Sequence, residues 1–191
     1  MRIVERIKAI CLKPKDEWQV IAAEQTSTAD LLKNYALPLA GAGAAAAFIG
    51  NSLVGFSNIA LGTVRVPMAS GLVASGLAIG LWLAIVYVAA LLIEALAPRF
   101  GAEKNHSQAV KVAVYAATPG WVGGLLSIVP PLAPLGLLAH IYGLYLLYLG
   151  LQQLMKAPAD KALPYTGAIA GGWIVMTIVA DRVIRNVAGI G

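Results

Sequence analysis

The chain has 191 residues, of which 59% are apolar and only 12% are charged, and its mean hydropathy is +0.78. These values exclude an ordinary soluble domain and favour an integral membrane protein. The net charge of +5 needs no nucleic acid to explain it, because the 14 basic residues are spread along the chain and mixed with acids. Nucleic-acid binding would instead gather them in one patch.

Long segments without Asp, Glu, Lys or Arg define the expected architecture. They are 34–64, 66–93, 112–155 and 162–180. About 20 apolar residues in a helix cross a bilayer, so the run 112–155 is long enough to cross twice. Pro130, Pro131 and Pro134 lie near its middle and forbid a continuous helix, which predicts two antiparallel spans joined by a tight turn.

The sequence therefore predicts an all-α, polytopic membrane protein, a bundle of five transmembrane helices. The expected spans are about 35–56, 68–96, 109–129, 132–154 and 164–184. A β-barrel is excluded because the runs are uniformly apolar and lack two-residue alternation.

Residues 1–33 form the expected cytosolic amphipathic N-terminal segment, which precedes a transmembrane domain at 34–191. Ile3, Ile7, Ile10 and Cys11 recur at three- and four-residue spacing, which indicates a short helix lying on the cytosolic leaflet and ended by Pro14. Ser27 and Asp30 have the spacing of a capping box at the start of the first span.

The basic residues also predict the orientation. Eleven of them flank one face of the predicted bundle and three flank the other, which places the N-terminus in the cytosol and the C-terminus outside a cell inner membrane. The eleven are Arg2, Arg6, Lys8, Lys13, Lys15, Lys33, Arg99, Lys104, Lys111, Lys156 and Lys161; the three are Arg65, Arg182 and Arg185. Lys111 is assigned here to the loop before the third span.

Small residues recur at intervals that bring helix backbones close together. Gly-x-x-x-Gly spacing occurs at 76–80, 120–124 and 167–171, and Gly136, Gly143 and Gly150 form a stripe down the fourth span. In lipid such stripes permit tight helix packing. We favour packing within one bundle over a dimer seam, with a homo-oligomer left open.

The candidate site is a polar and packing seam between the third and fourth spans. Pro119 frees the carbonyl of Tyr115, and Thr118 is expected to bond to local backbone groups at the resulting kink. Tyr145 is expected to donate to a carbonyl freed by this kink. The seam as a whole comprises Tyr115, Thr118, Pro119, His140, Tyr142, Gly143, Tyr145 and Tyr148.

His140 is the only ionisable residue predicted well inside a span. We favour a neutral imidazole bonded within the bundle over a proton relay or ligand. The sequence has no paired carboxylates near a span end, no Cys/His metal spacing and no phosphate loop. It therefore predicts no catalytic, cofactor-binding or metal residues, and no enzyme.

Several segments together resemble the bacterial branch of the Yip family, the Ypt/Rab-interacting type of integral membrane protein. They are Glu5–Lys8, Pro14–Trp18, Tyr35–Pro38, Tyr115–Pro119 and Ile141–Leu151. The resemblance covers most of the chain and implies five helices, a cytosolic N-terminus and a short C-terminus outside. Eukaryotic relatives are associated with Rab GTPases and vesicle traffic, but this chain has only a short segment before its first span.

These observations predict a non-enzymatic membrane-organising or partner-scaffolding component. Its basic segments would contact the anionic headgroups of membrane lipids, at about 1 kcal/mol per suitably placed Lys or Arg, and it has a possible protein partner. The alternative is a channel or transporter subunit for a small solute or lipid, with His140 and the tyrosines along its path.

Overall fold

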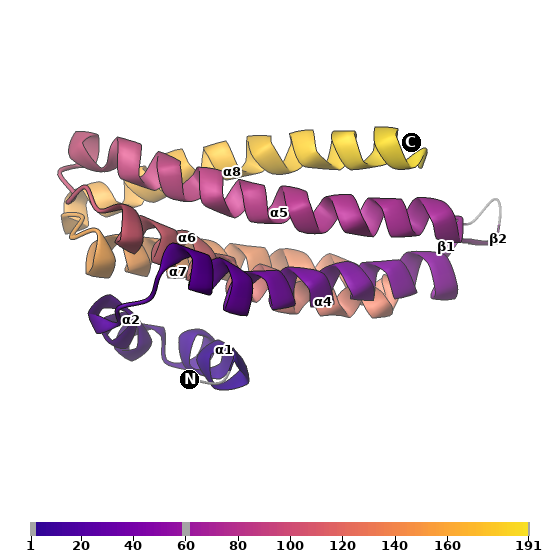
Figure 1. Cartoon of the computed structure of the whole chain (residues 1–191), viewed down its shortest axis with the longest axis horizontal. Coiled ribbons are helices and arrows are strands. Elements are labelled where there is room, and N and C mark those ends of the chain that lie inside the picture. The colour runs from indigo at the N-terminus through magenta and orange to yellow at the C-terminus, as the bar shows by residue number, and fades with distance from the viewer. Residues whose placement is uncertain (1–2, 59–61, 191) are drawn as a thin grey trace.

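The computed structural model describes residues 3–58 and 62–190, so Arg2 lies outside the described part. Five long apolar helical segments run side by side along the molecule, and two short helices lie at one end of the bundle (Figure 1). The segments are Thr28–Val54, Met68–Phe100, His106–Ile128, Pro130–Leu154 and Ala159–Ala188. The predicted all-α membrane fold with five spans is confirmed.

The helix of the first span begins at the capping box that the sequence predicts. The Asp30 amide donates to Ser27 Oγ at 3.0 Å, which satisfies one free amide of the first turn. The span consists of α3 (Thr28–Leu31), the π-helical turn η1 (Leu32–Ala36), α4 (Leu37–Phe48) and a second π-helical turn, η2 (Ile49–Val54).

A short β-hairpin, which the sequence analysis did not predict, joins the first two spans. Gly55 ends η2 with a φ of +86°, a conformation that favours glycine. Strand β1 (Phe56–Asn58) then pairs with β2 (Gly62–Val64) in antiparallel register. The second span is α5 (Met68–Leu96) extended by the 3₁₀ turn η3 (Ala97–Phe100).

The turn between the third and fourth spans is longer than the tight turn that we expected. Helix α6 (His106–Gly124) ends in a 3₁₀ turn, η4 (Leu125–Ile128), and a second 3₁₀ turn, η5 (Pro130–Leu135), leads into α7 (Gly136–Leu154). Prolines are tolerated at the start of such a turn, where their missing amide needs no partner. The last helix is α8 (Ala159–Ala188).

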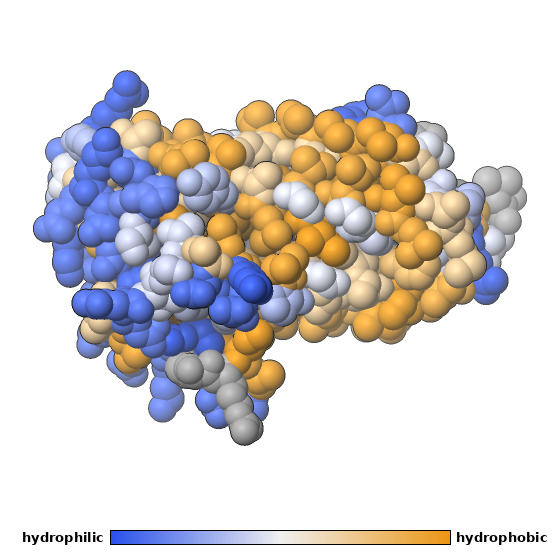
Figure 2. Space-filling model, viewed as in Figure 1, coloured by the Kyte–Doolittle hydropathy of each residue, from blue (hydrophilic) through white to orange (hydrophobic). Residues whose placement is uncertain are grey.

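The spans differ in how much of their surface the protein covers. In its most apolar stretch, 67% of the His106–Ile128 span is buried, compared with 11% of the Ala159–Ala188 span. Helix α6 therefore lies at the centre of the bundle and α8 on its outside. Figure 2 shows an apolar band around the middle of the visible face and hydrophilic residues gathered at the end that carries the two short helices.

The glycine stripe of the fourth span packs inside this bundle. A Cβ on Gly143 would lie 2.8 Å from Ala116 O, and a Cβ on Gly136 would lie 3.4 Å from Gly123 O. By contrast, a Cβ placed on Gly76, Gly80, Gly167 or Gly171 would meet no atom of another described segment within 4 Å. Intramolecular packing thus accounts for the stripe in α7, whereas the spacings in α5 and α8 lie on open surface.

The N-terminal segment is a pair of helices, α1 (Ile3–Leu12) and α2 (Pro14–Ala23), which we call the N-terminal hairpin. The apolar face predicted to lie on lipid packs against the protein itself. Ile10 and Ile21 are fully buried, and Ile3 and Ile7 pack against the same core. Contact between the hairpin and a lipid leaflet stays a prediction.

Candidate docking site of the N-terminal hairpin

Arg6 is buried where the hairpin meets the bundle. Its side chain is only 5% exposed, and its guanidinium bonds both Glu17 on α2 and Glu24 in the linker that leads to the first span. Burial alone would lower the pKa of Arg6, but the hydrogen bond to Glu24 and the two nearby carboxylates raise it above its usual value. Arg6 therefore stays charged, and it ties α1 to α2 and to the linker.

Aromatic rings connect this ion-pair cluster to the membrane-spanning helices. The Arg6 guanidinium carbon lies 5.5 Å from the centre of the Tyr115 ring on α6, a distance typical of cation–π contacts. The Tyr115 ring also meets Trp18 edge-on at 6.2 Å and the Tyr35 ring at 4.9 Å. The Tyr35 hydroxyl in turn lies 3.0 Å from Thr118 Oγ1, so hairpin, first span and third span converge at Tyr115.

The end of α2 is capped by side chains of α6. Lys111 Nζ donates to Ile21 O at 3.0 Å and also to Glu24 O, and Gln108 Nε2 donates to Ala22 O at 3.2 Å. The last carbonyls of a helix have no partner within it and carry partial negative charge. A buried lysine suits this position, because it satisfies these carbonyls and complements the helix dipole.

Two further contacts hold the hairpin against α7. The Trp18 ring packs on Gly150, where a Cβ would come within 2.9 Å of the indole. The Tyr142 hydroxyl donates to Cys11 O at 2.8 Å. We call this set of contacts the hairpin clamp, and it consists of Arg6, Glu17, Trp18, Glu24, Gln108, Lys111, Tyr115, Tyr142 and Gly150.

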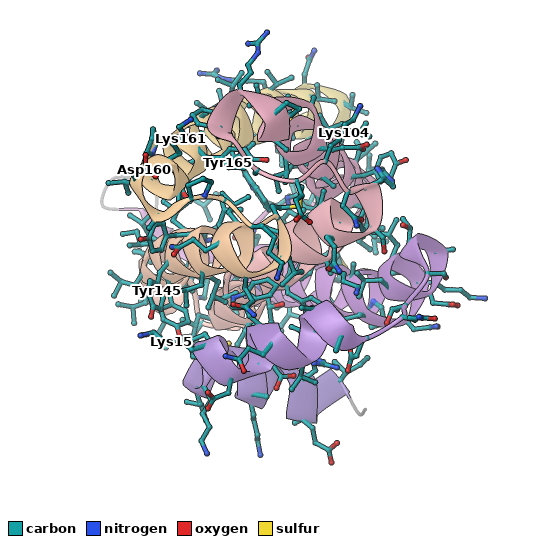
Figure 3. All side chains as sticks on the ribbon, turned by 90° about the vertical axis from the view of Figure 1, so that its left-hand side faces the viewer. Lys15, Lys104, Tyr145, Asp160, Lys161 and Tyr165 are labelled. Carbon is teal, nitrogen blue, oxygen red and sulfur yellow. The ribbon has the colours of Figure 1, made fainter. Side chains whose placement is uncertain are left out.

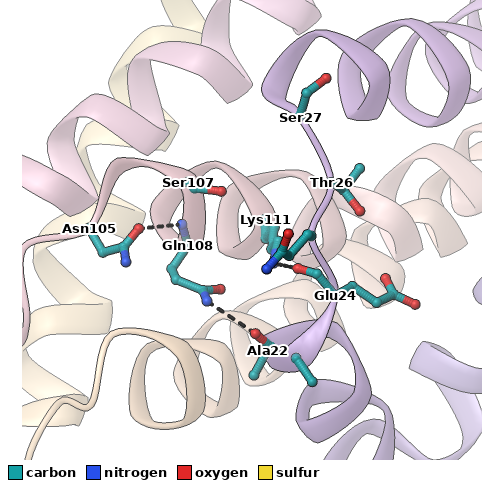
Figure 4. A pocket seen from close by; sticks show the side chains of 10 residues that line it. Ala22, Glu24, Thr26, Ser27, Asn105, Ser107, Gln108 and Lys111 are labelled. Atoms are coloured by element: carbon teal, nitrogen blue, oxygen red, sulfur yellow. Dashed lines mark hydrogen bonds between the residues drawn. The ribbon is translucent and has the colours of Figure 1, made fainter.

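Cavities lie on both sides of the linker between α2 and the first span. One has a volume of about 540 Å³ and is lined by Ser27, Asn105, Gln108 and Lys111 among others. Figure 4 shows Gln108 bonded to Ala22 at the end of α2 and Lys111 bonded to Glu24 in the linker. The second has a volume of about 340 Å³ and is lined by Arg6, Tyr35 and Tyr115 among others. Clamp residues thus line both cavities: Gln108 and Lys111 line the first, and Arg6 and Tyr115 line the second.

The eight predicted seam residues do not form one site in the structure. They lie beside the hairpin, between α6 and α7, or on the outer surface of α7. Tyr115 belongs to the hairpin clamp. Thr118 lies one helical turn further along α6, and its hydroxyl is bonded to the Tyr35 hydroxyl of the first span rather than to its own backbone. Tyr142 also belongs to the clamp. Pro119 is buried inside α6, which continues through it.

The other residues of the predicted seam lie elsewhere. His140 Nδ1 lies 2.8 Å from Gly136 O of its own helix, and the ring fills the space over Gly120. Gly143 lies against α6, and Tyr148 is partly buried against the core. Tyr145 is 41% exposed, and its ring meets Tyr142 at 5.7 Å, so it faces outward instead of toward α6 at Pro119.

Most of the hairpin clamp was not predicted from the sequence. Lys111 was assigned to a loop, but it lies within α6 and is only 3% exposed. Arg6 falls on the same helical face as Ile3 and Ile10, since it is three residues from one and four from the other. The charge of Arg6 on this apolar face is a local signal from which a buried ion pair could have been predicted.

The fold and this site define a class: a polytopic α-helical membrane protein whose N-terminal hairpin is clamped to one end of its bundle. The model of the Yip1 domain family matches residues 8–180, and the chain belongs to that family. It is 28% identical over 171 residues to "Inner membrane protein YohC" of Escherichia coli strain K12, covering 87% of each chain. The protein of the same name in E. coli O6:H1 matches equally well, and no solved structure matches.

Proposed function

We propose that this integral membrane protein is a non-enzymatic membrane-organising or partner-scaffolding component of the inner membrane. In this proposal the N-terminus is cytosolic and the C-terminus lies outside. The hairpin clamp fixes the position of the hairpin, and the outer face of the hairpin meets anionic lipid headgroups and a protein partner. The inner-membrane location of the E. coli relatives supports the choice of membrane.

The observation that carries the proposal is the difference between the two faces of the hairpin. The inner face is buried by the clamp, whereas Leu12 is 77% exposed and Val4 is 60% exposed. Lys8, Lys13 and Lys15 are exposed beside them. Exposed apolar residues flanked by lysines are typical of surfaces that lie at the headgroup level of an anionic leaflet.

The place of the hairpin along the bundle supports the same function. The backbone carbonyl of Cys11 accepts a hydrogen bond from the Tyr142 hydroxyl of α7. The adjoining part of α7 has an exposed apolar surface that includes Leu138 and Ile141. The hairpin lies on the side of the bundle opposite α8 (Figures 1 and 3). In this proposal the turn between α1 and α2, from Leu12 to Lys15, adjoins the surface that α7 presents to lipid.

A depth measurement on the full-length protein tests the lipid contact. A spin label on Leu12→Cys, in a Cys11→Ser background, is compared in vesicles of phosphatidylglycerol and of phosphatidylcholine. We expect the label to be accessible to oxygen at headgroup depth and to lie deeper in the anionic vesicles. Lys13→Gln with Lys15→Gln should abolish the difference, whereas Lys161→Gln, at the start of α8, should not. Equal exposure of the label to water in both vesicles would contradict the proposal.

The alternative, a channel or transporter subunit, would place His140 along a conduction path, and the contacts of His140 support it less than they support a packing role. Its Nδ1 lies within hydrogen-bond distance of a carbonyl in its own helix, and its ring is packed on Gly120. His140→Gln provides a direct comparison. A changed permeability of reconstituted vesicles, with expression maintained, would favour transport over scaffolding.

A further inference from the structure

We propose that the cavity beside Arg6 binds the headgroup of an aminophospholipid, a lipid whose phosphate carries a primary ammonium group, such as phosphatidylethanolamine. We call this cavity the Arg6 cavity. Its volume is about 340 Å³, within the range of small-molecule sites. The polar groups that line it include Arg6, Glu24, Asp30, Asn34, Tyr35 and Tyr115.

The charges around the Arg6 cavity favour a cation. Arg6 is the one cation among the described residues that line it, and it is already paired with Glu17 and Glu24. Asp30 adds a further carboxylate to the wall, and it accepts a hydrogen bond from the Ser27 hydroxyl at 2.6 Å. A primary ammonium group carries three donors and a positive charge, so it complements the carboxylates of Asp30 and Glu24.

An unpartnered hydroxyl points to a second polar group on the ligand. Tyr115 is only 5% exposed and lines the cavity, and its hydroxyl makes no hydrogen bond within residues 3–58 and 62–190, whereas the Tyr35 hydroxyl is bonded to Thr118. The Tyr115 hydroxyl is not one of the fully enclosed unpaired atoms of these residues, so it opens into the cavity and is free to bond a ligand. A phosphate oxygen would accept from Tyr115 and lie close to Arg6, which leaves the ammonium group for Asp30.

The walls of the Arg6 cavity also suit the rest of a lipid. Ile3 and Leu31 supply apolar surface for the methylene groups. The cavity lies at the start of the first span, where the acyl chains would follow α4 past Leu37, which is 42% exposed.

These features distinguish the headgroup of phosphatidylethanolamine from those of phosphatidylglycerol and phosphatidylcholine. Phosphatidylglycerol has the phosphate but no cation for Asp30 and Glu24, and phosphatidylcholine has a cation that cannot donate hydrogen bonds. The inference does not depend on the leaflet contact proposed for Lys13 and Lys15, because neither lysine lines the Arg6 cavity. The two proposals can therefore fail separately.

Lipid retention by the full-length protein tests the inference. The purified protein is equilibrated in micelles with equal amounts of phosphatidylethanolamine, phosphatidylcholine and phosphatidylglycerol, and bound lipid is counted by native mass spectrometry. We expect phosphatidylethanolamine to be retained about five-fold over each of the others, which corresponds to about 1 kcal/mol. Asp30→Asn and Tyr115→Phe should each remove this preference.

Two matched variants control for effects outside the Arg6 cavity. Asp16→Asn removes an exposed carboxylate of α2, and Tyr145→Phe removes an exposed hydroxyl of α7; both should retain the preference. Equal retention of the three lipids, or a preference unaffected by both Asp30→Asn and Tyr115→Phe, would overturn the inference. Stronger binding of soluble phosphoethanolamine than of the lipid would overturn the lipid assignment.

Discussion

Helix α6 is held by two interfaces of opposite character. Toward α7 it presents small residues: Gly123 meets Ala139 and Gly136, and Ala116 meets Gly143. Toward the N-terminal hairpin it presents Lys111, Gln108 and Tyr115, which bond carbonyls or stack on charged and aromatic side chains. The first interface relies on close backbone packing, and the second relies on paired polar groups.

The difference follows from where each interface lies. In the apolar band no solvent drives helices together, so van der Waals contact between small residues is the main source of attraction. At the hydrophilic end water competes for polar groups, so a buried Arg6 is tolerated only if both of its partners are in place. The α6–α7 seam should therefore respond to added volume, and the hairpin clamp to lost charges.

The largest effect is expected from removing the central cation of the hairpin clamp. Arg6→Met leaves Glu17 buried without its partner, and breaking a buried pair typically costs about 3–5 kcal/mol. The hairpin should then undock, which faster maleimide labelling of Cys11, the only cysteine, would report. Lys8→Met on the exposed side of α1 is the control. An unchanged labelling rate in Arg6→Met would mean that the ion pairs do not hold the hairpin.

Added volume at the α6–α7 seam should come next. The Cβ of Gly143→Ala would lie 2.8 Å from Ala116 O, and such overpacking typically costs about 1–3 kcal/mol. We expect a lower midpoint of thermal unfolding in detergent. Gly167→Ala, where nothing lies within 4 Å, should be neutral or slightly stabilising, because alanine favours helix. Equal effects of the two substitutions would argue against close packing at Gly143.

Removing the lysine that caps α2 should weaken hairpin docking to a smaller extent. Lys111→Met keeps the length of the side chain but leaves Ile21 O and Glu24 O without a donor, at a cost of about 1–3 kcal/mol. Hydrogen exchange of the α2 amides should accelerate while exchange in α7 stays slow. Lys104→Met, on an exposed loop position, is the control. Faster exchange in both helices would indicate general unfolding instead.

The pH dependence of Cys11 labelling should give the smallest effect. Burial raises the pKa of the Cys11 thiol, so less reactive thiolate is present at a given pH than for an exposed cysteine. The labelling rate of the wild-type protein should rise toward its plateau at higher pH than that of Arg6→Met. The undocked variant loses the burial, so its thiol pKa should fall. Coincident pH profiles would show that Cys11 is not covered by the hairpin contacts.

The sequence predicts the membrane-spanning part well, because each element there has a local signal. Charge-free runs mark the five spans, Ser27 marks the start of the first one, and the stripe through Gly143 marks the side of α7 that packs on α6. The turn around Pro130 was predicted, but its two 3₁₀ segments and the β-hairpin after Gly55 were not, since short 3₁₀ and β segments carry weak patterns.

The hairpin clamp could be predicted only in part, because its contacts join residues far apart in the chain. Arg6 bonds Glu24, and Lys111 bonds the carbonyl of Ile21; nothing in the sequence near Lys111 indicates that partner. Backbone carbonyls have no side-chain signature at all. Tyr115 was singled out for its proline neighbour, whereas its position depends on rings supplied by the hairpin and the first span.

The central claim is that the hairpin clamp docks the hairpin on the bundle, and hydrogen exchange of the full-length protein in lipid nanodiscs tests it most directly. The account predicts that amides of α1 and α2 are protected in the wild-type protein. It also predicts that Arg6→Met removes this protection and leaves α7 unchanged. Hairpin amides that exchange at the rate of a free peptide in the wild type, or that stay protected in Arg6→Met, would contradict it.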